Sequence, residues 1–374
     1  MATLYAKDAN QIYERLGSWL KVPDAPSFHD VLEILITPEE STVVLELTRP
    51  ASCEQLASRL NVNPKIFLPQ LEELVRRGWL RLNANGYYAP PANPRFMPKI
   101  ALPGVSETRN KTVWNNFFYQ DWGRILVGDR ERVLATKGHN QWRFAPAGMA
   151  LAMSPNILPK YILKSEDVRD MVRRATDITV HECGCRENRA KCSRPVETCI
   201  RVVWNGKVDT SDAQSGGHEN QVHISADRAI DIMDEAEESG LCHTLLNASG
   251  LEEAITICSC CPCCCYLLYP VLQAGKAHKL ITPSRYRAAI DTEKCAGCQT
   301  CVERCHFDAI EMRKVPGSKK MKAFMVSENC LGCGVCMIKC PNQAMRLELV
   351  RPPEHIPTRP MSQASSMPTR FKEA

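Results

Sequence analysis

Eight cysteines in the last quarter of the chain follow one spacing twice. The first copy reads Cys295-Ala-Gly-Cys298-Gln-Thr-Cys301-Val-Glu-Arg-Cys305, and the second reads Cys330-Leu-Gly-Cys333-Gly-Val-Cys336-Met-Ile-Lys-Cys340. Each cysteine of the first copy has a counterpart 35 residues later, so the segment is an internal repeat. A cubane iron–sulfur cluster needs four thiolates. A loop with three closely spaced cysteines can supply three of them, and the fourth comes from elsewhere.

This C-x2-C-x2-C-x3-C run resembles that of the bacterial two-cluster ferredoxins, over about residues 283–350. In such a run the fourth cysteine of each copy ligates the other cluster. Two [4Fe-4S] clusters are thus expected, with Cys295, Cys298, Cys301 and Cys340 as one ligand set and Cys330, Cys333, Cys336 and Cys305 as the other. Zinc sites read instead as separated cysteine pairs, and disulfides between cysteines so arranged would be strained.

His306 stands where the second copy has Pro341. This departure from the ferredoxin pattern concerns the local turn and not a ligand. We expect His306 at the surface, with a place beside the second cluster as the alternative.

A second set of cysteines lies in the middle of the chain. The apolar segment 178–180 leads into His181-Glu182-Cys183-Gly184-Cys185-Arg186, and residues 181, 183 and 185 would share one face of a strand. The apolar segment 255–257 leads into Cys258-Ser-Cys260-Cys261-Pro-Cys263-Cys264-Cys265. We expect these two segments to form adjacent strands that deliver ligands to one place.

Not all of these thiols can bind one iron, because adjacent side chains diverge. We favour a third iron–sulfur cluster held by a subset, with zinc or a redox-active dithiol as alternatives. The candidates are Cys183, Cys185, Cys192, Cys199, Cys258, Cys260, Cys261, Cys263, Cys264 and Cys265, and His181 is a further possible ligand. Arg186 would lower a thiol pKa or bind an anion; the alternative is a solvated arginine.

The segment 27–88 predicts helices followed by a hairpin with a glycine turn at Gly86, an order that resembles a winged helix. The helix that would read DNA offers Lys65, Arg76 and Arg77 against two glutamates, which is a weak basic face. Nucleic-acid binding is therefore not favoured, and protein docking is.

Other segments follow standard patterns. Residues 110–126 carry a core stripe of aromatic and aliphatic side chains. Ser165 is expected to cap a helix that ends near Ala175, and Ser225 another that ends at Gly240. Residues 311–324 predict a basic hairpin, either simply solvated or docking an acidic redox partner.

The whole layout resembles a group of anaerobic iron–sulfur proteins that join a winged-helix start, C-x-C-R and C-x-C-C-x-C-C modules, and a ferredoxin end. We expect an α+β multidomain chain: a winged-helix-like domain (1–90), an α/β cysteine-rich middle domain (91–282), a bacterial ferredoxin-like domain (283–350) and a flexible tail (351–374). Residues 89–98 would be a linker, and 100–105 an extended segment.

The cysteine content and the pattern of apolar residues indicate the cellular compartment of the protein. The chain has 374 residues and 20 cysteines, with neither a run of 18 apolar residues nor the apolar core of a signal peptide. This predicts no transmembrane segment and a reducing, anaerobic cytoplasm. The net charge of +5 does not by itself imply nucleic acid.

The predicted function is electron transfer, as an iron–sulfur protein or a subunit of an anaerobic oxidoreductase with a redox protein as partner. The alternatives are a redox-sensing transcription regulator and a thiol/disulfide reductase at the middle cysteines. Neither a Walker loop nor the C-x3-C-x2-C run of radical-adenosylmethionine enzymes is present. The sequence determines neither the electron donor and acceptor nor the oligomeric state, and it leaves open whether the chain is itself an enzyme.

Overall fold

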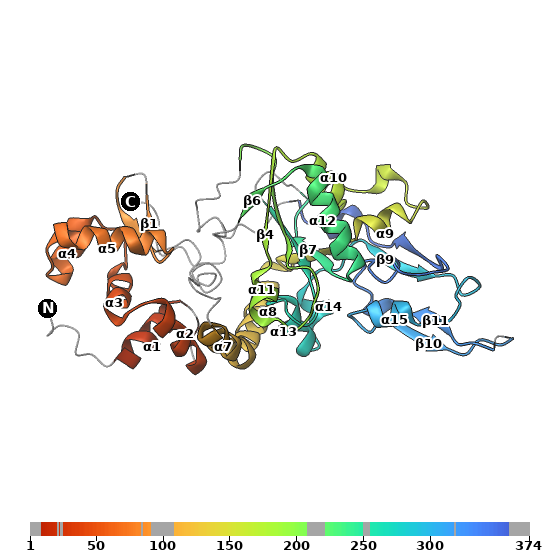
Figure 1. The fold of residues 1–374 in the computed structure, drawn as a ribbon, viewed down its shortest axis with the longest axis horizontal. Coiled ribbons are helices and arrows are strands. Elements are labelled where there is room, and N and C mark those ends of the chain that lie inside the picture. The colour runs from red at the N-terminus through yellow and green to blue at the C-terminus, as the bar shows by residue number, and fades with distance from the viewer. Residues whose placement is uncertain are drawn as a thin grey trace. The chain divides into compact units, whose positions relative to one another are not determined.

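The structure is a computed structural model that describes residues 9–20, 22, 25–83, 85–90, 108–207, 221–249, 255–317 and 319–358. Those up to Ile125 form one compact unit, and those from Leu126 onward form a second (Figure 1). The fold is mixed α+β with antiparallel sheets. The predicted linker beyond residue 90, the extended segment 100–105 and the tail beyond residue 358 lie outside the described residues. The predicted boundary at residue 283 falls inside the second unit, and the four-part division stays a prediction.

The first unit begins with short helices and a two-stranded sheet. Its elements are α1 (Ala9–Trp19), α2 (Pro26–Leu35), α3 (Pro38–Glu46), α4 (Cys53–Leu60), α5 (Pro64–Arg76), β1 (Arg81–Leu82) and β2 (Tyr88–Ala89). Capping boxes start α3 and α4, from Thr37 with Glu40 and from Ser52 with Gln55. The predicted order of helices and hairpin is present, and the winged-helix resemblance stays a prediction.

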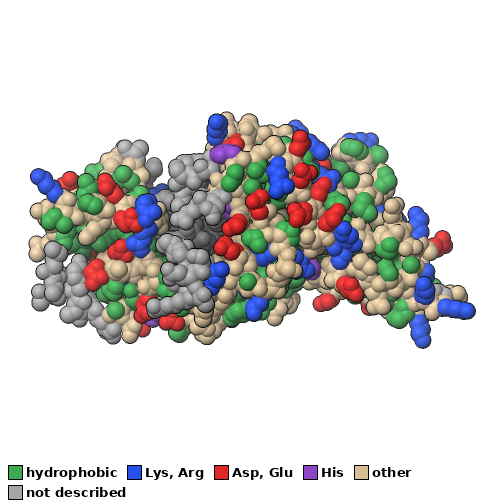
Figure 2. Space-filling model, viewed as in Figure 1, with side chains coloured by type: hydrophobic (Ala, Val, Ile, Leu, Met, Phe, Trp, Pro, Cys, Tyr) green, Lys and Arg blue, Asp and Glu red, His purple; other side chains and the backbone are tan. Residues whose placement is uncertain are grey.

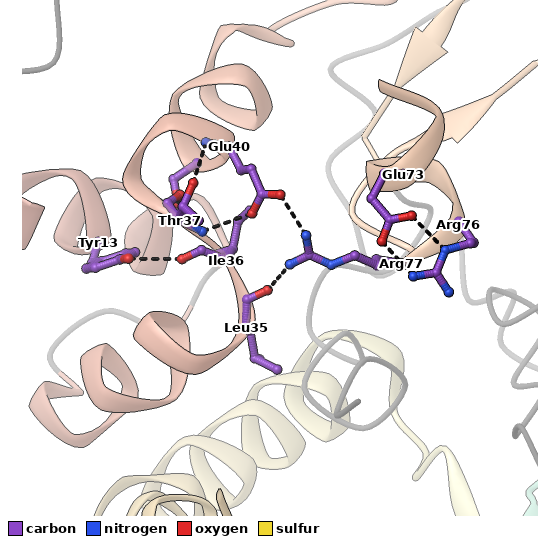
Figure 3. Close-up of polar contacts among 9 residues, drawn as sticks. Tyr13, Leu35, Ile36, Thr37, Glu40, Glu73, Arg76 and Arg77 are labelled. Atoms are coloured by element: carbon purple, nitrogen blue, oxygen red, sulfur yellow. Dashed lines mark hydrogen bonds and ion pairs between the residues drawn. The ribbon is translucent and has the colours of Figure 1, made fainter. Parts of the chain in front are cut away.

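Arginines at the end of α5 are paired with carboxylates (Figure 3). Arg76 contacts Glu73 at 2.6 Å, and Arg77 contacts Glu40 of α3 at 2.7 Å. Arg77 also donates to the backbone carbonyl of Leu35, at the end of α2. The contacts of Arg77 hold the end of α5 against α2 and α3.

The aromatic stripe of residues 110–126 is core, as predicted. It spans α7 (Thr108–Phe117), a π-helical turn (Phe118–Trp122) and the start of α8 (Gly123–Lys137). Trp114, Phe117 and Phe118 are buried, and the ring of Phe117 lies 4.9 Å from that of Phe28 in α2.

A six-stranded sheet forms the middle of the second unit. Its strands are β3 (Trp142–Ala145), β4 (Asp177–Glu182), β5 (Glu197–Val203), β6 (Val222–His223), β7 (Cys242–Leu246) and β8 (Ile255–Cys260), in the order β3-β7-β8-β5-β4-β6. Every pairing is antiparallel, so the predicted α/β character is wrong in the strict sense of parallel strands. The prediction that segments 178–180 and 255–257 are adjacent is also wrong. The chain folds back after β4 to form β5, which pairs with β4 on one side and β8 on the other.

The two faces of this sheet have different roles. Ile178, Val180, Ile200, Val202 and Ile257 pack in one core cluster with side chains of α10 (Val168–Arg173) and α12 (Ala226–Glu238). Figure 1 shows α12 lying across the strands. Because side chains alternate along a strand, the cysteines at 199, 258 and 260 point to the opposite face.

The cap of α12 is Ser225, as predicted. The cap of α10 is Asp167 and not the predicted Ser165, because the Asp167 carboxylate accepts hydrogen bonds from the amides of Arg169 and Asp170 in the first turn of the helix. Short helices complete this region: α9 (Gly148–Ala152), a 3-10 turn (Pro159–Tyr161), α11 (Gly184–Arg189), α13 (Leu268–Gln273) and α14 (Ala277–Leu280).

The repeat segment folds as two small sheets around the cysteine turns. Its elements are β9 (Tyr286–Ile290), α15 (Thr300–Arg304), β10 (Ile310–Arg313), β11 (Lys322–Met325), a 3-10 turn (Ser327–Asn329), β12 (Met345–Leu349) and a 3-10 turn (Pro353–His355). Strand β9 pairs with β12, and β10 pairs with β11, which confirms the predicted hairpin. Lys and Arg side chains are exposed toward its tip (Figure 2).

Polar contacts join the repeat segment to elements that flank the middle sheet. Glu166 binds Arg285 at 2.7 Å, with both side chains at most 2% exposed, and also accepts from the Tyr286 hydroxyl. Arg304 of α15 donates to the carbonyls of Glu237 and Glu238 at the end of α12. The repeat segment is therefore an integral part of the second unit.

The first residues of the predicted tail pack back onto this unit. The His355 ring bonds the carbonyl of Pro283, and Ile356 is 2% exposed. No helix in the described part of the chain combines the length and apolar character needed to cross a bilayer.

Candidate metal centres

The ten cysteines between residues 183 and 265 divide into two groups. One, here called the six-thiol ring, comprises Cys183, Cys185, Cys199, Cys258, Cys260 and Cys265. The other, here called the four-thiol site, comprises Cys192, Cys261, Cys263 and Cys264. The sequence neighbours Cys260 and Cys261 belong to different groups, as do Cys264 and Cys265, whereas the neighbours Cys263 and Cys264 both belong to the four-thiol site.

Each thiol of the six-thiol ring is hydrogen-bonded to two others. The order is Cys183, Cys199, Cys258, Cys260, Cys265, Cys185 and back to Cys183. The sulfurs of Cys260 and Cys265 lie 3.2 Å apart. Strands β5 and β8 supply three members, the start of α11 supplies two and the turn after β8 supplies one. The sheet thus gathers thiols that are up to 82 residues apart in the sequence.

The predicted strand alternation of residues 181, 183 and 185 is wrong beyond Glu182. Strand β4 ends there, Cys183 is the N-cap of α11, and Cys185 lies in the first turn of that helix. His181 is buried and pairs across the strands with Cys199, so its side chain lies on the same sheet face as that thiol.

Contacts with other thiols and burial together raise the pKa of thiols in the ring. The hydrogen bond with Cys185 is the largest cause that raises the pKa of Cys183 to about 12. Hydrogen bonds with neighbouring thiols and burial hold the pKa of Cys199 and Cys260 well above its usual range. Neutral, buried thiols are poor free nucleophiles, whereas a bound metal ion deprotonates thiols that coordinate it.

Arg186 lies between the two thiol groups and is 2% exposed, so the alternative of a solvated arginine is wrong. Its guanidinium donates to the carbonyls of Pro195 and Ser259, to the Thr198 hydroxyl at 2.6 Å and to Cys261 Sγ at 3.7 Å. The positive charge is thereby fixed beside the four-thiol site.

The four-thiol site is compact. Cys192 Sγ lies 4.0 Å from Cys261 Sγ and 3.8 Å from Cys264 Sγ, and the sulfurs of Cys263 and Cys264 lie 3.7 Å apart. All four sulfurs lie within 4.8 Å of one another. Arg194 donates to Cys263 Sγ at 3.8 Å.

The first four-cysteine set of the repeat segment surrounds one cavity. The cavity is small, and Cys295, Cys298, Cys301 and Cys340 all line it. Burial is the largest cause that raises the pKa of Cys301 to about 11, followed by the charges of Cys295 and Cys298. The set therefore combines one cysteine turn with the fourth cysteine of the other copy, as the predicted ligand exchange requires.

The second set gathers in the same way. Burial raises the pKa of Cys305 to about 11, and Cys333 and Cys330 of the other copy add to it electrostatically. Burial also holds the pKa of Cys336 well above its usual range, and the charges of Cys333, Cys305 and Cys330 act in the same direction. The ligand roles of both sets stay predictions.

Corresponding positions of the two copies also have the same backbone conformation and the same amide contacts to sulfur. Gly297 and Gly332 both have positive φ, of 74° and 69°, and a Cβ there would lie 2.3 Å from the Met321 carbonyl oxygen or 2.2 Å from that of Tyr286. The amides of Ala309 and Ala344 donate at 3.4 Å to Cys305 Sγ and Cys340 Sγ. Amides directed at sulfur are suited to clusters, whose anionic charge they stabilise.

Residues 294–344 match the family model of the 4Fe-4S dicluster domain. The chain thus carries an iron–sulfur, ferredoxin-like domain near its C-terminal end, here called the dicluster segment. Searches of the curated proteins and of the solved structures found no match. This domain and the middle cysteines together support an iron–sulfur electron-transfer role in general terms.

Cys242 is not among the candidate ligands predicted from the sequence. It is fully buried at the start of β7, where it pairs with Cys260 of the six-thiol ring, and its thiol is hydrogen-bonded to Cys333 of the dicluster segment. This bond is the largest cause that raises the pKa of Cys242 and lowers that of Cys333. Cys242 is therefore a thiol that donates to the Cys333 sulfur.

The sequence held only a partial signal for this contact. Cys242 follows the end of a predicted helix at Gly240, which suggests the start of a strand, but the strand register that sets it opposite Cys260 depends on the folded sheet. His306 is half-buried, and its ring nitrogen Nε2 lies 2.7 Å from the carbonyl oxygen of Gly240.

Proposed function

We propose that the protein is an electron-transfer component of an anaerobic oxidoreductase in the cytoplasm. It would carry two [4Fe-4S] clusters in the dicluster segment and a third iron–sulfur centre on a subset of the six-thiol ring. Such clusters accept and release electrons at potentials set by charge, hydrogen bonding and exposure. The chain would position them and set their surroundings.

The observation that carries the proposal is the position of Cys242. It lies directly opposite Cys260 across β7 and β8, and it is hydrogen-bonded to Cys333. Directly opposed residues in an antiparallel pair have Cα atoms about 4.5–5.5 Å apart. One residue thus lies between the second ligand set and the six-thiol ring, which favours electron exchange between the two.

The residues of the six-thiol ring fit an iron–sulfur centre. They offer more thiols than the four that a cubane needs, and Cys183, Cys260 and Cys265 are buried. Hydrogen-bonded neighbours such as Cys260 and Cys265, whose sulfurs lie 3.2 Å apart, would move apart to bind two irons of one cluster. The ring suits a thiol/disulfide reductase poorly, since Cys260 and Cys265 are at most 5% exposed and hydrogen bonds with neighbouring thiols, together with burial, raise the pKa of each. Catalytic thiols need access and a lowered pKa.

The first unit is better suited to protein docking than to nucleic acid. The helix that would read DNA has three basic side chains, and two of them, Arg76 and Arg77, pair with carboxylates (Figure 3). The same helix exposes Ile66 and Leu68, at 63% and 39%. We propose that this unit binds an oxidoreductase subunit.

Iron and sulfide analysis of anaerobically purified protein tests the proposal. We expect about twelve irons per chain, since each cubane holds four, and about eight in Cys258→Ser. Cys53→Ser is the matched control, because Cys53 lies in α4 of the first unit. Eight irons in both the wild type and Cys258→Ser would rule out the third centre. Redox-dependent gel shifts with specific DNA would favour the regulator instead.

A further inference from the structure

We propose that Cys192, Cys261, Cys263 and Cys264 bind one zinc ion, separate from every iron–sulfur centre. The site joins the loop between α11 and β5 to the turn that follows β8. The inference rests on three independent features of the described residues: sulfur spacing, charge and enclosure.

The sulfur spacing fits a single tetrahedral ion. Zinc–thiolate bonds are about 2.3 Å, so the edges of a regular ZnS4 tetrahedron are about 3.8 Å. Three of the sulfur pairs lie 3.7, 3.8 and 4.0 Å apart. The thiolates of a cubane bind four different irons at its outer corners and lie farther apart than sulfurs that share one ion. The spacing therefore favours one ion over a cluster.

The charge around the site complements that of a four-thiolate zinc centre. Four thiolates and Zn2+ have a net charge of −2. Two guanidiniums face the sulfurs: Arg186 at 3.7 Å from Cys261 Sγ and Arg194 at 3.8 Å from Cys263 Sγ. Arg194 is itself held by the carbonyl of Ser239. Such outer contacts orient metal ligands.

Backbone amides reach the other two sulfurs. The amide of Lys191 bonds Cys264 Sγ, and that of Arg194 bonds Cys192 Sγ. Each of the four sulfurs thus has a donor from outside the site.

The site is closed. Cys261 and Cys264 are fully buried against Ala236 of α12 and Leu241, which follows that helix, and Cys192 and Cys263 are half-buried. Four protein ligands leave no open position for a substrate, which is the arrangement of structural zinc. The ion would fix the turn whose neighbouring residues, Cys260 and Cys265, belong to the six-thiol ring.

Metal analysis of the full chain tests the inference. We expect about one zinc per chain in anaerobically purified protein, less than a fifth of that in Cys192→Ser, and an unchanged value in Cys53→Ser. Zinc should stay in Cys258→Ser even as iron falls, so failure of the third iron–sulfur centre and failure of the zinc site are distinguishable. Zinc retained by Cys192→Ser, or iron found in its place, would overturn the inference.

A second measurement guards against misfolding of the variant. Protein produced with cobalt in place of zinc should acquire the intense visible bands of tetrahedral cobalt thiolate, and Cys192→Ser should lose them while the electron paramagnetic resonance spectra of the reduced dicluster segment remain. Absence of these bands in cobalt-loaded wild-type protein would contradict the site.

Discussion

In the dicluster segment, three of the four thiols of each set come from one short turn, and the fourth comes from the other copy of the cysteine run. In the six-thiol ring, the thiols come from two strands, a helix start and a separate turn. The first arrangement is written locally in the spacing of cysteines. The second exists only when β5 pairs with β8. The two regions should therefore respond differently to the same loss of core packing.

The largest expected effect follows from truncating the core beneath the ring. Ile257 is fully buried in β8, next to Cys258. Ile257→Ala should cost about 3 kcal/mol of unfolding free energy, because it leaves a cavity. We expect iron in the third centre to fall while about eight irons stay in the dicluster segment, measured by iron analysis and thermal unfolding under anaerobic conditions. Equal loss from both regions would show that the ring is no more fold-dependent than the repeat.

An intermediate effect is expected at the contact between the two regions. Cys242→Ala removes the thiol that donates to Cys333 Sγ, so the potential of the second cluster should fall by about 40–60 mV. That value follows from a net hydrogen bond of about 1–1.5 kcal/mol and the equivalence of 1.4 kcal/mol to 59 mV for one electron.

Redox titration followed by electron paramagnetic resonance measures this shift. Cys242→Ser keeps a donor and should move the potential less than Cys242→Ala. A rise in potential in Cys242→Ala, or equal shifts in the two variants, would contradict the assigned hydrogen bond.

The smallest expected effect concerns the basic hairpin. Its strand β11 lies against the first ligand set, since the Ala323 amide donates to Cys295 Sγ. Lys314→Glu with Lys319→Glu should slow oxidation of the reduced protein by anionic ferricyanide about two- to fivefold at low salt, and the difference should shrink as salt is added.

The control variant changes the net charge by the same amount at two lysines outside the hairpin. Lys137→Glu with Lys164→Glu should slow the reaction less. If the two double variants behave alike, the hairpin is a solvated loop and not an entry point for electrons.

The difference between the dicluster segment and the six-thiol ring also determines which parts of the structure could be predicted from the sequence. The repeat, its hairpin and the helix capped by Ser225 could be predicted because their signals are local: spacing, turn residues and a cap. The ring could not. The cysteine at 199 is isolated in the sequence, and only the apolar alternation of Ile200 and Val202 indicates the strand that carries it. The order of strands depends on long-range pairing, which local patterns do not encode.

Arg186 and Cys242 illustrate the same limit. An arginine beside cysteines is as consistent with solvent as with burial until the strands around it are placed. The contact of Cys242 with Cys333 joins residues 91 positions apart in the sequence.

The divergence of Cys260 from Cys261, and of Cys264 from Cys265, has a consequence for insertions and deletions. One residue added between Cys260 and Cys265 would change the length of the turn that joins the two sites, so Cys265 could not reach the six-thiol ring while Cys261, Cys263 and Cys264 all keep their places in the four-thiol site. A replacement of Pro262 keeps the count and leaves each thiol on its own side. In this segment the number of residues constrains variation more than the identity of those that are not cysteine.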